Sequence, residues 1–167
     1  MKKIIYYITD HGLGHATRSI AIIRELQKLD FQIIVRNTNA QDMLKMSLKK
    51  IKIVPGKTDT GTIINSDGFS INETKSKTVL KHWIKNLPNY VDEECNFITK
   101  IKPSLVISDI SLMPLLASKK VGVTNLAISN FSWYDVLKFL PKKELAKIKT
   151  LYNSADFTIQ LPLGTKM

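Results

Sequence analysis

Short apolar runs of strand length alternate with amphipathic segments along the whole chain, and this alternation restricts the fold more than any other feature. Strands are predicted at residues 3–9, 31–36, 51–54, 105–108, 123–128 and 157–161, the first and fourth of them buried. Helical periodicity falls between them, at residues 17–29, 42–48, 74–100, 112–119 and 142–154. Strands that alternate with helices favour right-handed βαβ units and a parallel sheet covered on both faces. The sequence therefore predicts a doubly wound α/β domain.

The size and composition of the chain fit one such domain. It has 167 residues, of which 44% are hydrophobic, enough for a real core. Its one cysteine, Cys95, excludes a disulfide scaffold and a thiolate-rich zinc site, and fits a reducing, cytoplasmic setting. The apolar run at residues 4–8 is too short for a signal peptide, and no apolar run is long enough to span a membrane. We expect a single domain over residues 1–167.

Three segments depart from the regular alternation. Residues 58–72 are rich in Thr, Gly, Asp and Asn, which predicts a loop with one short strand at residues 62–64. The helix at residues 74–100 contains Pro88 and is expected to kink there. Residues 161–164 form a Pro/Gly segment that can lead into further structure, which leaves open that the chain is half of a larger architecture.

The junction after the first strand carries the most informative motif. In open α/β sheets, ligands bind beyond the carboxyl ends of the strands. Gly12 and Gly14 permit a tight turn there and a close backbone approach to a ligand. Peptide N–H groups at the helix start can face an anion, and Arg18 can add a bidentate donor one turn later.

A dinucleotide site is one reading of this junction. The spacing Gly12-x-Gly14 matches two thirds of the nicotinamide-dinucleotide fingerprint, but Thr17 stands at the third position. The second strand ends in Arg36-Asn37, with no acid for a ribose hydroxyl, although Arg36 could serve a 2′-phosphate. The motif is thus a poor match to this class.

A zinc site is a second reading. His11 and His15 are four residues apart, as on a zinc-binding helix. Two glycines lie between them, which makes a regular helix unfavourable, and the glutamate of the H-E-x-x-H motif is missing. We therefore expect no metal at this junction.

His15 at the helix start is instead a candidate general base. Histidine is the side chain best suited to remove a proton from a hydroxyl near neutral pH. Asp109 follows the strand at residues 105–108 and so lies at the same edge, where a carboxylate can orient the imidazole. Two plainer readings stay open: a structural histidine, and Asp109 as the N-cap of the next helix.

Three ordered segments resemble the amino-terminal domain of two-domain, GT-B type glycosyltransferases. The first is Gly12-x-Gly14-His15-x-x-Arg18, similar to the G-x-G-H-A-T-R subgroup, which is related to MurG-like and UDP-glycosyltransferases and includes the amino-terminal part of plant arabinose kinases. The second is the strand that ends at Asp109, followed by Pro114. The third is the Asn-Phe-Ser-Trp stretch from Asn130 to Trp133. The resemblance implies a Rossmann-like fold.

The resemblance also implies an activity: transfer of a sugar from a nucleotide-sugar donor to an acceptor hydroxyl, with inversion and without a metal. It makes His15 the general base and Asp109 its partner. It identifies five candidates for acceptor binding: Gly12, Gly14, Arg18, Asn130 and Trp133. Simple core packing is an alternative for Trp133. The carboxy-terminal, donor-binding half of such enzymes has no counterpart in this sequence. The chain is thus expected to be a fragment, to pair with a separate donor-binding chain, or to have lost transfer activity.

The formal net charge of +11 favours an anionic partner. Lysines cluster at residues 77, 81 and 85, and again at residues 138, 142, 143 and 147. Such clusters have two explanations. They are solvated helix faces, or they make a peripheral contact with the inner face of a membrane that carries a lipid-linked acceptor. Nucleic acid is not expected, because the chain has three arginines and no helix-turn-helix, RNP or zinc-finger motif. Two alternatives to the transferase stay open: a non-catalytic module of the same fold that binds phosphate or sugar or has a regulatory role, and a basic nucleic-acid-binding domain.

Overall fold

A computed structural model describes residues 1–162 and 164, and it shows a six-stranded parallel sheet. The strand order is β3-β2-β1-β4-β5-β6. The strands are β1 (Lys3–Ile8), β2 (Gln32–Arg36), β3 (Lys52–Val54), β4 (Leu105–Asp109), β5 (Asn125–Ser129) and β6 (Phe157–Gln160). All five pairings are parallel, which confirms the predicted Rossmann-like α/β class.

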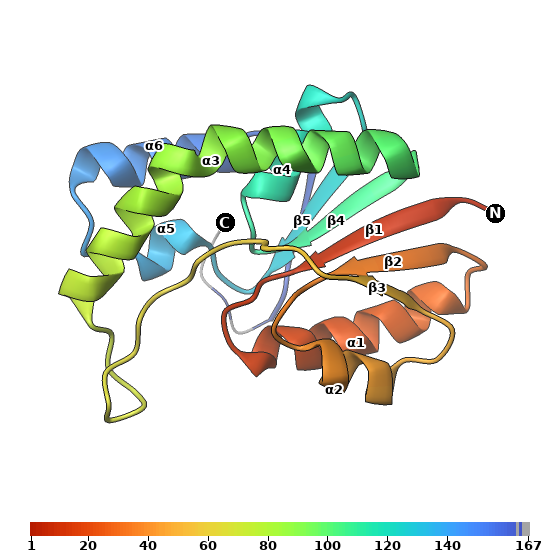
Figure 1. Cartoon of the computed structure of the whole chain (residues 1–167), viewed down its shortest axis with the longest axis horizontal. Coiled ribbons are helices and arrows are strands. Elements are labelled where there is room, and N and C mark those ends of the chain that lie inside the picture. Colours follow the sequence, from red (N-terminus) through yellow and green to blue (C-terminus); the bar gives the residue numbers. More distant parts are fainter. Residues whose placement is uncertain (163, 165–167) are drawn as a thin grey trace.

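Helices cover both faces of the sheet (Figure 1). One face packs against α1 (Leu13–Gln27) and α2 (Gln41–Ser47). The other packs against α3 (Glu73–Ile101), α4 (Met113–Lys120), α5 (Trp133–Val136) and α6 (Lys142–Tyr152). Strand β1 lies between the two layers: Ile5 and Tyr7 enter the core under α3, and Ile4, Tyr6 and Ile8 enter the core under α1. Because both faces are buried, the strand is apolar throughout instead of alternating.

The order of the strands reverses at β1. The chain runs outward from β1 to β2 and β3, and α3 then carries it back to β4, on the other side of β1. The carboxyl ends of β1 and β4 therefore flank the switch point where open α/β sheets bind their ligands.

Helix α1 begins at Leu13, four residues before the predicted start. The helix includes His15 but not His11, so the expectation that no regular helix joins the two histidines is confirmed. Gly12 makes the sharp turn out of β1 with a φ of 79°, a conformation that glycine adopts without strain, and it is the N-cap. Gly14 then lies in the first turn, where the cost of a glycine is about 1 kcal/mol and packing of the helix can offset it.

Other segments differ from the prediction in smaller ways. Helix α3 runs through Pro88 without a break and changes direction along its length (Figure 1). The short strand predicted at residues 62–64 is only an antiparallel bridge between Ile64 and Ile71. The loop expected after β5 contains α5, which begins with a capping box formed by Ser132 and Asp135. Leu163, in the predicted exit segment, lies outside the described residues.

No helix in the described part of the chain combines the length and the apolarity needed to cross a membrane.

Candidate active site

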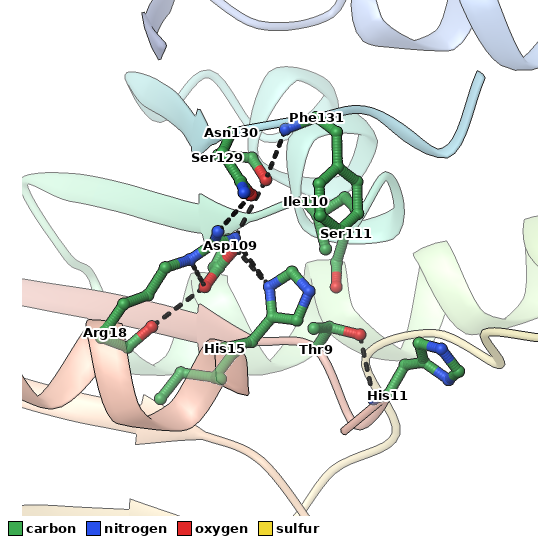
Figure 2. Close-up of polar contacts among 12 residues, drawn as sticks. Thr9, His11, His15, Arg18, Asp109, Ile110, Ser111, Ser129, Asn130 and Phe131 are labelled. Carbon is green, nitrogen blue, oxygen red and sulfur yellow. Dashed lines mark hydrogen bonds and ion pairs between the residues drawn. The ribbon is translucent and has the colours of Figure 1, made fainter. Parts of the chain in front are cut away.

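His15 and Asp109 meet at the switch point of the sheet (Figure 2). His15 lies in the first turn of α1, and Asp109 is the last residue of β4. Nδ1 of His15 is 2.9 Å from Oδ1 of Asp109, and only 8% of His15 and 1% of Asp109 is exposed. The predicted meeting of these two side chains is confirmed. The alternative of an Asp109 N-cap is not, because α4 begins at Met113 without a capping side chain.

Arg18 completes the cluster from one turn further along α1. Its Nε donates to Oδ2 of Asp109 at 3.0 Å, and its Nη2 donates to Oδ1 of the same carboxylate. Its Nη1 donates to Oδ1 of Asn130, and Nη2 also reaches Oγ of Ser129 at 3.0 Å. All three nitrogens of the guanidinium thus contact protein acceptors. Anion binding by Arg18 remains a prediction, and it would have to share a guanidinium that already holds β4 and the end of β5 together.

Two serines also belong to this cluster, and the sequence analysis did not identify either of them. Ser19 donates to Oδ2 of Asp109 at 3.1 Å, and Ser129 accepts from Arg18. Both are buried at the same edge. Ser19 could have been found from its place four residues after His15, because residues four apart share a helix face. Ser129 carried no such signal, since the end of β5 becomes a neighbour of α1 only in the folded sheet.

The contact with Asp109 favours the tautomer of His15 that carries its proton on Nδ1. An ionised carboxylate only accepts, so the contact with Asp109 requires a proton on Nδ1. Nη2 of Arg18 also lies 2.7 Å from Nδ1, but two donors cannot form a hydrogen bond with each other. The two hydrogens of Nη2 are accounted for by Asp109 and Ser129. In the neutral imidazole with its proton on Nδ1, Nε2 is the nitrogen able to accept a proton.

The glycine loop leaves open space beside His15. A Cβ atom added to Gly12 or Gly14 would meet no heavy atom within 4 Å. The start of α1 has no capping side chain and no acidic residue in its first turn, so its free N–H groups and the positive end of the helix dipole face that space. A ligand oxygen can approach the backbone here.

His11 lies on the other side of the loop from His15. Its backbone N–H donates to Oγ1 of Thr9 at 3.1 Å, its Nε2 is 3.3 Å from Oγ1 of Thr62, and its ring packs edge-on against Trp133 at 5.4 Å. Burial, and secondly the nearby His15, lower the pKa of His11. Among the residues that the structure describes, no group of three or more His, Cys, Asp or Glu side chains is placed to hold a metal ion.

Trp133 is 4% exposed and belongs to the core under α3. Of the two expectations for this residue, core packing is confirmed, and stacking on a ligand remains a prediction. Arg36, the residue available to a dinucleotide 2′-phosphate, is also engaged. It pairs with the buried carboxylate of Glu94 at 2.7 Å and stacks on the ring of Phe97.

Several known proteins resemble the chain. It is 24% identical over 168 residues to L-arabinokinase of Arabidopsis thaliana, covering 94% of this chain and 16% of that protein. Among solved structures, MurG of Acinetobacter baumannii matches with a TM-score of 0.63 and 14% identity, over 100% of this chain and 44% of MurG. The glycosyltransferase SsfS6 of Streptomyces sp. SF2575 matches with a TM-score of 0.58 and 17% identity, over 100% of this chain and 54% of SsfS6.

The structural likeness shows a shared fold, and the chain spans about a sixth of its curated relative and about half of these solved chains. The family itself is shown by a match to nearly the whole sequence. Residues 2–162 fit the family model described as glycosyl transferase family 1. The chain therefore belongs to glycosyl transferase family 1.

Proposed function

We propose that this chain is the acceptor-binding half of an inverting glycosyltransferase in which His15 is the general base. The acceptor hydroxyl lies in the open space beside Gly12 and Gly14, within reach of Nε2 of His15. Its oxygen bonds to the anomeric carbon of the donor as the bond from that carbon to the nucleotide phosphate breaks, and its proton passes to Nε2. Asp109 holds the imidazole by Nδ1–H and stabilises the imidazolium that forms.

The observation that carries the proposal is the 2.9 Å contact between His15 and a buried carboxylate, next to an open helix start. The fully buried Asp109 accepts from His15, Arg18 and Ser19, and so has a fixed orientation. The proposed base role leaves Nε2 of His15 for the acceptor hydroxyl, since both contacts of the ring to charged groups are made through Nδ1.

The donor is a nucleotide sugar held by a second domain or a second chain. Supporting this, the structural neighbour SpnG is a spinosyn rhamnosyltransferase, solved in complexes with its aglycone and with thymidine diphosphate, and this chain covers 41% of it. Helix dipoles and basic groups of the second half would stabilise the leaving nucleotide without a metal. The proposed setting is the cytoplasm.

The test is His15→Ala in a complete enzyme, meaning this chain together with its donor-binding half. Turnover should fall at least about a hundredfold, the contribution of a general base. His82→Ala is the matched control, because His82 is exposed on α3 and should tolerate the change. Normal turnover of His15→Ala would remove the catalytic role. If the chain binds a sugar or a phosphate but transfers no sugar even when a donor-binding half is supplied, the result would favour the non-catalytic module.

One contact links the segments that carry the two lysine clusters, which supports a peripheral membrane contact as part of this proposal. Nζ of Lys77 on α3 lies 5.7 Å from the centre of the Phe139 ring, which is next to Lys138. Helices α3 and α6 are neighbours, since Leu87 and Lys147 line the same pocket. A continuous basic surface would hold the enzyme at an anionic bilayer that carries its acceptor.

A further inference from the structure

A second buried carboxylate, that of Asp59, lies close to the candidate site and has no part in the proposed proton transfer. It belongs to the loop that follows β3, and only 3% of it is exposed. Within the described residues, no ion pair involves this carboxylate, in contrast to Asp109 and Glu94. A buried and unpaired carboxyl group is costly, so its retention needs an explanation.

The carboxylate joins the ends of three strands. Its oxygens accept from Oγ1 of Thr9, after β1, at 2.6 and 2.7 Å. Its Oδ2 also accepts from Oγ of Ser111, after β4, at 2.9 Å and from Nε1 of Trp133, after β5, at 3.2 Å. Burial raises the pKa of Asp59, and the hydrogen bonds from these three side chains oppose that rise.

The bond to Ser111 acts on a strained turn. Ile110, between Asp109 and Ser111, has a φ of 62°, a region that a β-branched residue rarely enters. The turn closes with a hydrogen bond from the N–H of Ser111 to the carbonyl of Asp109 at 2.8 Å. Such a conformation costs about 1–3 kcal/mol and persists only when the surroundings impose it. Two hydrogen bonds impose it here. Asp59 accepts from the Ser111 hydroxyl, and the Tyr152 hydroxyl donates to the Ile110 carbonyl at 2.7 Å.

We propose that Asp59 is a positioning residue, whose carboxyl group holds the strained turn at residues 109–111 so that Asp109 faces His15. Without the bond to Ser111, the turn would relax toward a negative φ at Ile110. That rotation would swing the Asp109 carboxylate away from Nδ1 of His15. The catalytic meaning of this positioning rests on the proposed function, but the positioning itself can be measured without any substrate.

An acceptor-only group fits this position for a simple reason. Every partner of Asp59 is a donor: two hydroxyls and an indole N–H. The Thr9 hydroxyl donates to Asp59 and accepts from the backbone N–H of His11, so the same carboxylate also fixes the start of the glycine loop. An asparagine can still accept through its oxygen, and Thr9 can turn to accept from its amide. Alanine can replace none of these contacts.

The test is nuclear magnetic resonance of the imidazole of His15, one of three histidines in the chain. The Nδ1–H proton paired with Asp109 should be visible in the native chain. Asp59→Ala should abolish that resonance and leave His15 in a mixture of tautomers. Asp59→Asn should retain it. Rescue by the conservative variant separates a hydrogen-bonding role from a loss of volume.

Glu94→Ala is the matched control, because it removes another buried carboxylate, on α3, that bonds Arg36 and not the turn. It should lower stability and leave the His15 resonance in place. If Asp59→Ala does not fold, Ser111→Ala decides the question, since it removes only the bond between Asp59 and the turn. An unchanged His15 resonance in the folded Asp59→Ala or Ser111→Ala variant would overturn the proposal. Loss of activity in His15→Ala concerns the proposed function alone, so the two can fail separately.

Discussion

Oδ1 of Asp109 lies 2.9 Å from Nδ1 of His15, although 94 positions separate the two residues in the chain. The parallel register that pairs Ile8 of β1 with Asp109 of β4 is what brings them together. The same carboxylate is the main acceptor for Arg18, whose side chain is 23% exposed. Asp109 thus contacts three side chains of α1, those of His15, Arg18 and Ser19, and its removal has two separate consequences.

Asp109→Asn should lower both turnover and stability. The amide no longer stabilises the imidazolium and can favour the wrong tautomer of His15, so we expect turnover of a complete enzyme to fall by about a thousandfold or more. It also leaves the largely buried guanidinium of Arg18 without its counter-ion, which should lower the free energy of unfolding by about 3 kcal/mol. Steady-state kinetics and urea unfolding measure the two effects.

Asp92→Asn provides the control for the effect on stability. Asp92 pairs with Lys120 at 2.6 Å, but 61% of each side chain is exposed. A surface pair of this kind contributes about 0–1 kcal/mol, so this variant should unfold almost like the native chain. Equal losses in the two variants would contradict the special place given to Asp109.

Arg18→Lys tests whether Arg18 positions protein groups or binds substrate. A lysine keeps the charge but cannot contact Asp109, Asn130 and Ser129 together, because it lacks the planar fork of the guanidinium. If the role is positioning, turnover should fall about ten- to hundredfold while the KM of the acceptor stays nearly constant. A raised KM with normal turnover would instead assign Arg18 to substrate binding, as the sequence motif suggested. Initial-rate kinetics with varied acceptor separate these outcomes.

The sequence predicted the sheet and the central pair because both follow from local patterns. Apolar runs identify all six strands, and the rule that ligands bind at the carboxyl edge selects His15 and Asp109. The tight turn at Gly12 was predicted, but the start of α1 was placed four residues too late because Gly14 lies inside the first turn of the helix, where periodicity gives no signal. A propensity is a weak prior that packing overrides.

The contacts of Asp59 could not be predicted in the same way. The residue lies in a segment with no periodicity, and its three partners come from the ends of three different strands. Only the folded sheet brings those ends together. The positive φ of Ile110 is equally hidden, since nothing in an isoleucine suggests that its backbone will enter the left-handed region.

The pH dependence of stability should differ between the native chain and Asp59→Asn. Because burial raises the pKa of Asp59 above its usual value of 3.8, the folded chain retains a proton that the unfolded chain has already released. Stability from this group is therefore greatest below 3.8 and is lost as the pH rises through the folded pKa. We compare the free energy of unfolding of the native chain with that of Asp59→Asn. The native value minus the variant value should decrease as the pH rises, by at most about 1.4 kcal/mol per pH unit. Urea unfolding from pH 4 to pH 7 measures it, and a difference that rises with pH would contradict the assignment.

Neutralising equal numbers of lysines on two different surfaces tests the basic surface over α3 and α6. Replacement of four exposed lysines by glutamine, at residues 138, 142, 143 and 147, should weaken binding to phosphatidylserine-containing vesicles by about three orders of magnitude at low salt, since each lysine near an anionic surface contributes about 1 kcal/mol. The same number of replacements around α2 and β3, at residues 45, 49, 50 and 52, removes equal charge from another surface and should change binding little. Vesicle sedimentation compares the two variants with the native chain. Equal losses would mean that the vesicles respond to net charge alone, and the proposed membrane-facing surface would be abandoned.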